Sequence, residues 1–108
     1  MKTMTAGDLE AIAFQIISNV GTAKSLAMEA LYDAKKGDFS SAETKLEEAR
    51  EYFVEGHKAH SDMIQKEAAG EQVTLTLLIM HAEDQLMNTE TIIELVNEMI
   101  DIHRKIND

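Results

Sequence analysis

The stretch LTLLIMHAEDQLMNTETIIELVNEMIDIHRKI, residues 75–106, decides the fold of this chain. Its apolar residues recur every three or four positions without an interrupting Pro or Gly, which is typical of a long amphipathic helix. The helix carries two apolar stripes on roughly opposite sides of an ideal helical wheel. The first stripe consists of Leu75, Leu78, Ile79, Ala82, Leu86, Thr89, Ile93, Val96 and Ile100. The second stripe consists of Leu77, Met80, Asp84, Met87, Thr91, Leu95 and Ile102.

The second stripe predicts contact with another subunit. One stripe is enough to pack a helix against two neighbours in a bundle, and only the wedge that contains Glu83, Glu90 and Glu94 is clearly left for water. Asp84 falls within the second stripe. A carboxylate at a helical seam is costly unless it is paired, protonated or bound to a cation, and it can fix the oligomeric state. We therefore expect Asp84 to control assembly.

Two further helices precede this one. Capping boxes at Thr5–Asp8 and Ser40–Glu43 predict where they begin, and Gly37 and Gly70 are predicted to end them. The predicted bounds are Thr5 to Lys36, Ser40 to about Ala69, and Gln72 or Val73 to about Ile106. Because the connections are short, the sequence predicts an all-α, antiparallel, up-down-up three-helix bundle.

Length and composition exclude several classes of protein. A chain of 108 residues predicts one domain over residues 1–108. It has no Cys, so neither a disulfide framework nor a thiolate metal site is possible. No apolar window is long enough to insert into a membrane, which predicts a cytoplasmic protein. The net charge of -10 argues against a nucleic-acid partner, because phosphates require a basic surface.

His81 is the candidate reactive residue. The spacing i, i+3, i+4 and i+7 brings His81, Asp84, Gln85 and Asn88 into one stripe of the helix, which suits a proton, a metal or a phosphoryl group. Neutral imidazole is a competent nucleophile, and the two amides could donate hydrogen bonds to an anion. The alternative is a non-catalytic helical oligomerisation or adaptor module in which His81 is structural.

A third reading is a metal-binding bundle that uses His57, His60 and Asp62. The two histidines have the i, i+3 spacing of a metal pair. The segment from Glu55 to Asp62 is polar all round, however, and this favours a solvated helical face. The absence of any Glu-x-x-His sequence argues against a ferritin-like di-iron bundle.

The segment His81-Ala82-Glu83-Asp84-Gln85-Leu86-Met87 closely resembles a family motif, His-Ala-Gln-Asp-His-Leu-Met. The motif belongs to enzyme IIA of the lactose/cellobiose (also chitobiose) branch of the bacterial sugar phosphotransferase system. The segments 6–17, 34–39 and 64–70 also resemble this family, so the resemblance spans essentially the whole chain.

The resemblance implies a homotrimer of nine helices, with the third helices near the threefold axis. It implies that His81, by way of Nε2, accepts a phosphoryl group from phospho-HPr. The group then passes to a cysteine of a cognate IIB protein during uptake of cellobiose, chitobiose or lactose. Asp84 would match the acidic residue that meets its symmetry mates at the axis and can hold Mg²⁺ or another divalent cation. Transfer itself would require no cofactor.

Two positions depart from the family motif. Glu83 stands where the family usually has Gln, and Gln85 where it often has a second His. Glu83 lies on the polar wedge, away from His81, so we expect it only to tune contact with a partner. Gln85 follows His81 by one turn and could donate an amide N–H to a phosphoryl oxygen.

Overall fold

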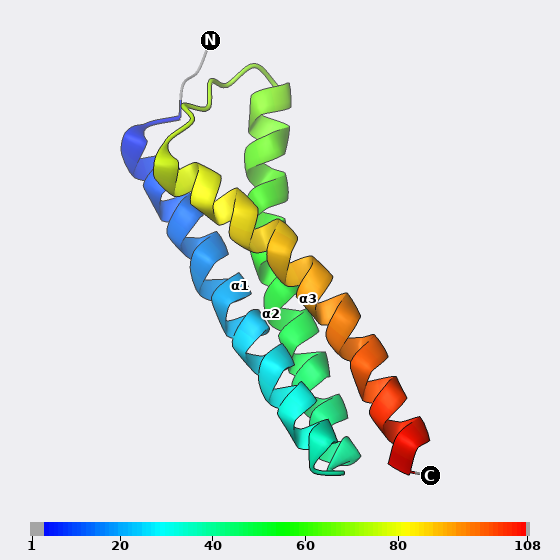
Figure 1. The fold of residues 1–108 in the computed structure, drawn as a ribbon. Helices are drawn as coiled ribbons and strands as arrows, with labels where there is room; N and C mark the ends of the chain where they lie inside the picture. Colours follow the sequence, from blue (N-terminus) through cyan, green and yellow to red (C-terminus); the bar gives the residue numbers. More distant parts are fainter. Residues whose placement is uncertain (1–3, 108) are drawn as a thin grey trace.

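The computed structural model describes residues 4–107, which form three α-helices. These are α1 (Ala6–Lys35), α2 (Phe39–Ala68) and α3 (Leu77–Asn107). Consecutive helices are antiparallel along an elongated bundle of 60 × 20 × 19 Å, and in the view of Figure 1 they run down, up and down. The predicted all-α, antiparallel three-helix bundle is thereby confirmed. Within the described part of the chain, no helix is both long and apolar enough to cross a membrane.

The first two helices begin at side-chain caps and end at glycines. Thr5 Oγ1 accepts a hydrogen bond from Asp8 N–H, and Asp8 Oδ2 accepts one from Thr5 N–H, as the capping box predicted. The predicted second box was wrong. Asp38 follows Gly37, whose φ is +85°. Oδ1 of Asp38 accepts a hydrogen bond from Ser41 N–H, so α2 begins at Phe39.

The third helix begins at Leu77, four or five residues later than predicted. Residues 71–76 form a non-helical connection in which Gln72 carbonyl oxygen accepts a hydrogen bond from Met4 N–H at 3.4 Å. The β-branched side chains of this connection disfavour a helix. Thr76 then provides the cap, because its Oγ1 accepts a hydrogen bond from Ile79 N–H at 3.1 Å.

Small side chains bring α1 and α2 close together. Their facing surfaces bury the alanines Ala13, Ala23, Ala27, Ala30, Ala34, Ala42, Ala49 and Ala59. At Gly56 of α2 the approach is so close that an added Cβ would lie 2.7 Å from Val20 Cγ1 of α1. The α1–α2 pair is therefore the tight side of the bundle, and it leaves no room for a side chain at this point.

The first stripe of α3 packs onto this pair, and it packs more extensively on α1 than on α2. Seven residues of the predicted stripe are buried: Ile79, Ala82, Leu86, Thr89, Ile93, Val96 and Ile100. Leu78 is only half-buried, and Leu75 was wrongly included, because it precedes the helix and is 74% exposed. Figure 1 shows the first turns of α3 diverging from the last turns of α2.

Ion pairs hold the opposite end of the bundle. Asp33 of α1 accepts hydrogen bonds from Lys45 Nζ at 2.8 Å and from Ser41 Oγ at 2.7 Å. The bonds from Lys45 and Ser41 lower the pKa of Asp33, and the bond to Asp33 raises the pKa of Lys45. Near the end of α3, the guanidinium of Arg104 pairs with Glu43 and lies 5.1 Å from the centre of the Phe39 ring.

Candidate functional site

His81 lies in the second turn of α3 and is exposed. Together with Leu77, Leu78 and Met80 it lines an open, mainly apolar hollow at the start of the helix. No hydrogen bond or ion pair involves its imidazole within residues 4–107. Both ring nitrogens are therefore available to a proton, a partner or a reacting group.

The other members of the predicted polar stripe lie on the same side of α3. Asp84 and Asn88 are exposed, and Gln85 is half-buried. Like His81, these three side chains make no hydrogen bond within the described chain. The helix thus presents a carboxylate and two amides beside the imidazole, and none of them is occupied by an internal contact.

The second apolar stripe of α3 faces outward from the single subunit. Its large side chains remain exposed by half or more: Leu77 84%, Met80 55%, Met87 63%, Leu95 51% and Ile102 54%. Met99 and Ile106 extend the same exposed surface toward the end of the helix. The prediction that two neighbouring helices cannot cover α3 is confirmed, and such a long apolar surface is typical of an interface.

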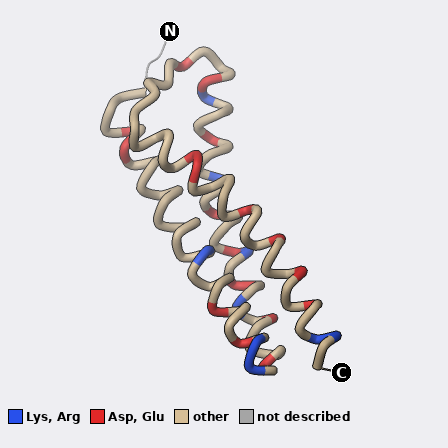
Figure 2. Tube along the Cα trace, in the orientation of Figure 1, with Lys and Arg blue, Asp and Glu red and all other residues tan. Residues whose placement is uncertain are grey.

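Negative charge dominates α3. Between Leu77 and His103 the helix has six acidic residues and no Lys or Arg: Glu83, Asp84, Glu90, Glu94, Glu98 and Asp101. Arg104 and Lys105 lie in the last turn, at the end of the molecule where Figure 2 shows basic residues close to the C-terminus. A partner that approaches His81 along this helix therefore meets a negative surface, which favours a positively charged partner.

Glu83 is only partly exposed to water, whereas we predicted that it lies on the solvent-facing wedge. Its Oε1 contacts Nε2 of His60 on α2, and the two side chains are 36% and 18% exposed. His60 therefore belongs to the interface between α2 and α3, and its assignment to a solvated face was also wrong. The two residues are far apart in sequence and on different helices, so only the packing of α3 against α2 reveals the pair.

The predicted alternative metal site is not assembled. His57 is exposed, and its Nδ1 lies 3.5 Å from Ser61 Oγ, whereas His60 faces α3. Over residues 4–107 there is no group of three or more His, Cys, Asp or Glu side chains that could hold a metal ion. A cation at Asp84 would therefore require carboxylates from more than one subunit.

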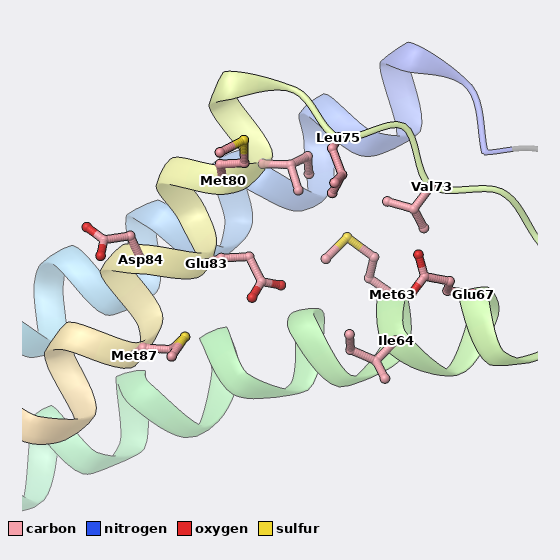
Figure 3. Close-up of a pocket in the computed structure, with 10 residues that line it drawn as sticks. Met63, Ile64, Glu67, Val73, Leu75, Met80, Glu83, Asp84 and Met87 are labelled. Carbon is pink, nitrogen blue, oxygen red and sulfur yellow. The ribbon is translucent and has the colours of Figure 1, made fainter.

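A cavity of about 480 Å³ separates the last turns of α2 from the first turns of α3. Its lining is mainly apolar and consists of Met63, Ile64, Glu67, Val73, Leu75, Ile79, Met80, Glu83, Asp84 and Met87. Figure 3 shows the carboxylate groups of Glu67 and Glu83 among the methionine side chains of both helices. Sequence reasoning missed this cavity, because it follows from the divergence of the two helices.

Comparison with known proteins gives a consistent match. The family described as PTS system, Lactose/Cellobiose specific IIA subunit matches residues 11–104. The lichenan-specific phosphotransferase enzyme IIA component of Bacillus subtilis (strain 168) is 42% identical over 101 residues, which are 94% of this chain and 92% of that protein.

Solved structures agree with this match. The crystal structure of the PTS cellobiose-specific enzyme IIA from Bacillus anthracis has a TM-score of 0.90 and 41% identity, over 97% of this chain and 94% of that one. The solution structure of the IIA(Chitobiose)-HPr complex from the Escherichia coli phosphotransferase system has a TM-score of 0.79 and 32% identity. That match covers 93% of this chain and 97% of the solved chain. The resemblance predicted from the motif at His81 is confirmed.

Proposed function

Because the chain belongs to the lactose/cellobiose-specific IIA family and is a phosphotransferase component, we propose that it carries a phosphoryl group on His81. The observation that carries this proposal is the position of His81 in the family-like motif, exposed and without an internal hydrogen bond in the described chain. An imidazole buried for structural reasons would need a partner for its polar nitrogens, whereas this one is open to a donor protein.

We infer that His81 takes the phosphoryl group from a phosphohistidine of HPr. The solved complex of a chitobiose IIA with HPr supports this partner. In this step a bond forms between Nε2 of neutral His81 and phosphorus, while the bond between phosphorus and the donor imidazole breaks. The other nitrogen of His81 keeps its proton. The bond that breaks and the bond that forms both join phosphorus to an imidazole nitrogen, so alignment of the reacting atoms is the main requirement.

We propose that the phosphoryl group then passes to a cysteine thiolate of a cognate IIB protein. The bond between phosphorus and His81 breaks as the bond to sulfur forms, and His81 returns to its neutral state. The amide groups of Gln85 and Asn88 lie on the same side of α3 and would donate hydrogen bonds to phosphoryl oxygens. No cofactor is needed in either step.

We propose that the subunit assembles as a homotrimer through the second stripe of α3. The exposed side chains of Leu77, Met80 and Met87 support this proposal, because each would lose its contact with water in such an interface. The three Asp84 side chains would meet near the axis, where protons or a divalent cation such as Mg²⁺ would offset their repulsion. Asp84 would then serve assembly, while His81 serves transfer.

We propose that the transported sugar is a β-linked disaccharide such as cellobiose, chitobiose or lactose. The names of two relatives support this class, one being specific for cellobiose and the other belonging to the N,N'-diacetylchitobiose branch. Growth of a strain that lacks this chain, on each disaccharide in turn, tests the assignment. Unchanged growth on all three sugars would contradict it.

Incubation with phosphoenolpyruvate, enzyme I and HPr tests the phosphocarrier function directly. We expect one acid-labile phosphoryl group per subunit, located on His81 by fragmentation of the intact phosphopeptide at neutral to basic pH. A helical adaptor with a structural His81 would take up no phosphate. Omission of HPr provides the control, because direct labelling by enzyme I would contradict the proposed donor.

A further inference from the structure

One polar contact attaches the start of α3 to α2. It joins Glu83 Oε1 to His60 Nε2, and both side chains are mostly shielded from water. Over the described residues, the other hydrogen bond between these helices joins Arg104 to Glu43 at the far end of the bundle. The first turns of α3 therefore depend on the His60–Glu83 contact for their polar attachment to α2.

Apolar packing between the two helices is incomplete beside this contact, although Ala59 and Met63 of α2 share a buried cluster with Ile79 and Ala82 of α3. The cavity of about 480 Å³ lies between the last turns of α2 and the first turns of α3, and Glu83 is part of its lining. Figure 3 shows the Glu83 side chain directed from α3 into the space that faces α2. Because a cavity provides no opposing atoms, the hydrogen bond at its edge carries a larger share of the attachment.

Glu83 and His81 occupy opposite sides of the same helical turn. Two residues correspond to about 200° around the helix axis, so the carboxylate reaches back to α2 while the imidazole faces outward. A rotation or shift of this turn would move both side chains together. Phosphoryl transfer is sensitive to such a shift, since a misplacement of about 1 Å can slow a reaction about 100-fold.

We propose that His60 and Glu83 are positioning residues, which hold the first turns of α3 on α2 and thereby fix His81 for phosphoryl transfer. The bond is donated by Nε2–H of His60 and accepted by the Glu83 carboxylate. Neither residue touches the phosphoryl group. The attachment is a property of the folded chain, whereas its effect on transfer rests on the proposed function of His81.

Hydrogen exchange of the unphosphorylated protein tests the attachment without any partner. We expect Glu83→Ala and His60→Ala each to raise amide exchange in residues 78–84 by roughly fivefold, the effect of one partly buried hydrogen bond. The double variant should exchange no faster than either single variant. Glu83→Gln keeps an acceptor oxygen for His60 and should restore slow exchange. Glu90→Ala is the matched control, because Glu90 lies two turns further along a similar side of α3, exposed and without a partner in the described chain.

Rapid-quench transfer from phospho-HPr tests the consequence for His81. Glu83→Ala and His60→Ala should lower the maximal rate constant roughly three- to tenfold. The phospho-HPr concentration that gives half the maximal rate should stay within about twofold of the wild-type value. A purely structural role would reduce only the folded fraction, so the assays are run at a temperature where melting curves show every variant folded.

Two results would overturn the proposal. The first concerns amide exchange in residues 78–84. The proposal fails if exchange in Glu83→Ala and His60→Ala is no faster than in Glu90→Ala, or if exchange in Glu83→Gln is as fast as in Glu83→Ala. The second is a maximal transfer rate in both alanine variants equal to that of wild type. If wild-type protein gains no phosphate on His81, the proposed function fails, whereas the exchange experiment still supports or refutes the attachment.

Discussion

His81 and Glu83 lie two residues apart on α3 and face opposite sides of the helix. The imidazole of His81 is exposed, while the carboxylate of Glu83 contacts His60 on α2. One helical turn therefore combines a reactive surface with an attachment to the bundle. The arrangement places the proposed phosphoryl acceptor on a regular helix, whose backbone is more rigid than a surface loop.

His81→Ala should abolish phosphoryl uptake and leave the fold intact. The side chain is exposed and makes no internal hydrogen bond in the described chain, so its removal should change the free energy of unfolding by less than about 0.5 kcal/mol. Mass spectrometry after incubation with enzyme I and HPr measures uptake, and circular dichroism measures the fold. His57→Gln is the control, since His57 is also exposed. An unchanged phosphorylated fraction in His81→Ala would refute the assignment.

Periodicity in the sequence was sufficient to predict the three helices and the buried face of α3. Seven residues of the first stripe of α3 are buried as predicted, because helical spacing determines which residues share a face. Helix starts were less predictable. At both Asp38 and Thr76, local side-chain hydrogen bonds decided between several polar residues that could each begin a helix.

The candidate site was predictable only where it lies on one helix. The grouping of His81, Asp84, Gln85 and Asn88 follows from spacing along α3; Gln85 is half-buried and the other three are exposed. The His60–Glu83 pair and the cavity beside it depend on the angle between α2 and α3. That angle results from packing in three dimensions, and no local pattern in a single sequence encodes it.

Thr89→Val should stabilise the protein. Thr89 is fully buried, and its Oγ1 has no hydrogen-bond partner among residues 4–107. Valine has nearly the same shape and removes a hydroxyl group that lost its contact with water on folding, so we expect a gain of about 1 kcal/mol. Urea denaturation measures the change. A loss of stability of similar size would show that this hydroxyl has a partner in the assembled protein.

Gly56→Ala and Gly21→Ala should have opposite effects. Alanine favours a helix by about 1 kcal/mol over glycine, and a Cβ at Gly21 would meet no atom within 4 Å. At Gly56 the added Cβ would lie 2.7 Å from the buried Val20, and overpacking of this kind costs about 1–3 kcal/mol. The melting temperature should thus rise for Gly21→Ala and fall for Gly56→Ala. Equal shifts for the two variants would show that α1 and α2 can separate freely.

Asp33→Asn should destabilise the protein near neutral pH and have no effect in strong acid. Bonds from Lys45 and Ser41 lower the pKa of Asp33 below its ordinary value of 3.8. The charged carboxylate therefore contributes stability above about pH 3.8, and this contribution is lost as the pH falls through the lowered value. Melting temperatures of the variant and wild type should converge in that range. Asp62→Asn, at an exposed position, is the control. A constant difference at all pH values would contradict an electrostatic origin.

Asp84→Leu should stabilise the proposed trimer. Three carboxylates near one axis repel each other by an energy on the order of several kcal/mol, at an effective dielectric constant of about 20. Leucine would replace this repulsion with apolar burial beside Met80 and Met87, both of which are exposed in the single subunit. Light scattering should show an intact trimer, and its melting temperature should exceed that of wild type most clearly when a chelator is present. The matched control is Glu94→Leu, which adds the same side chain at an exposed position of the polar wedge. Dissociation of Asp84→Leu into monomers, or a lower melting temperature in chelator, would show that Asp84 contributes a favourable contact between subunits.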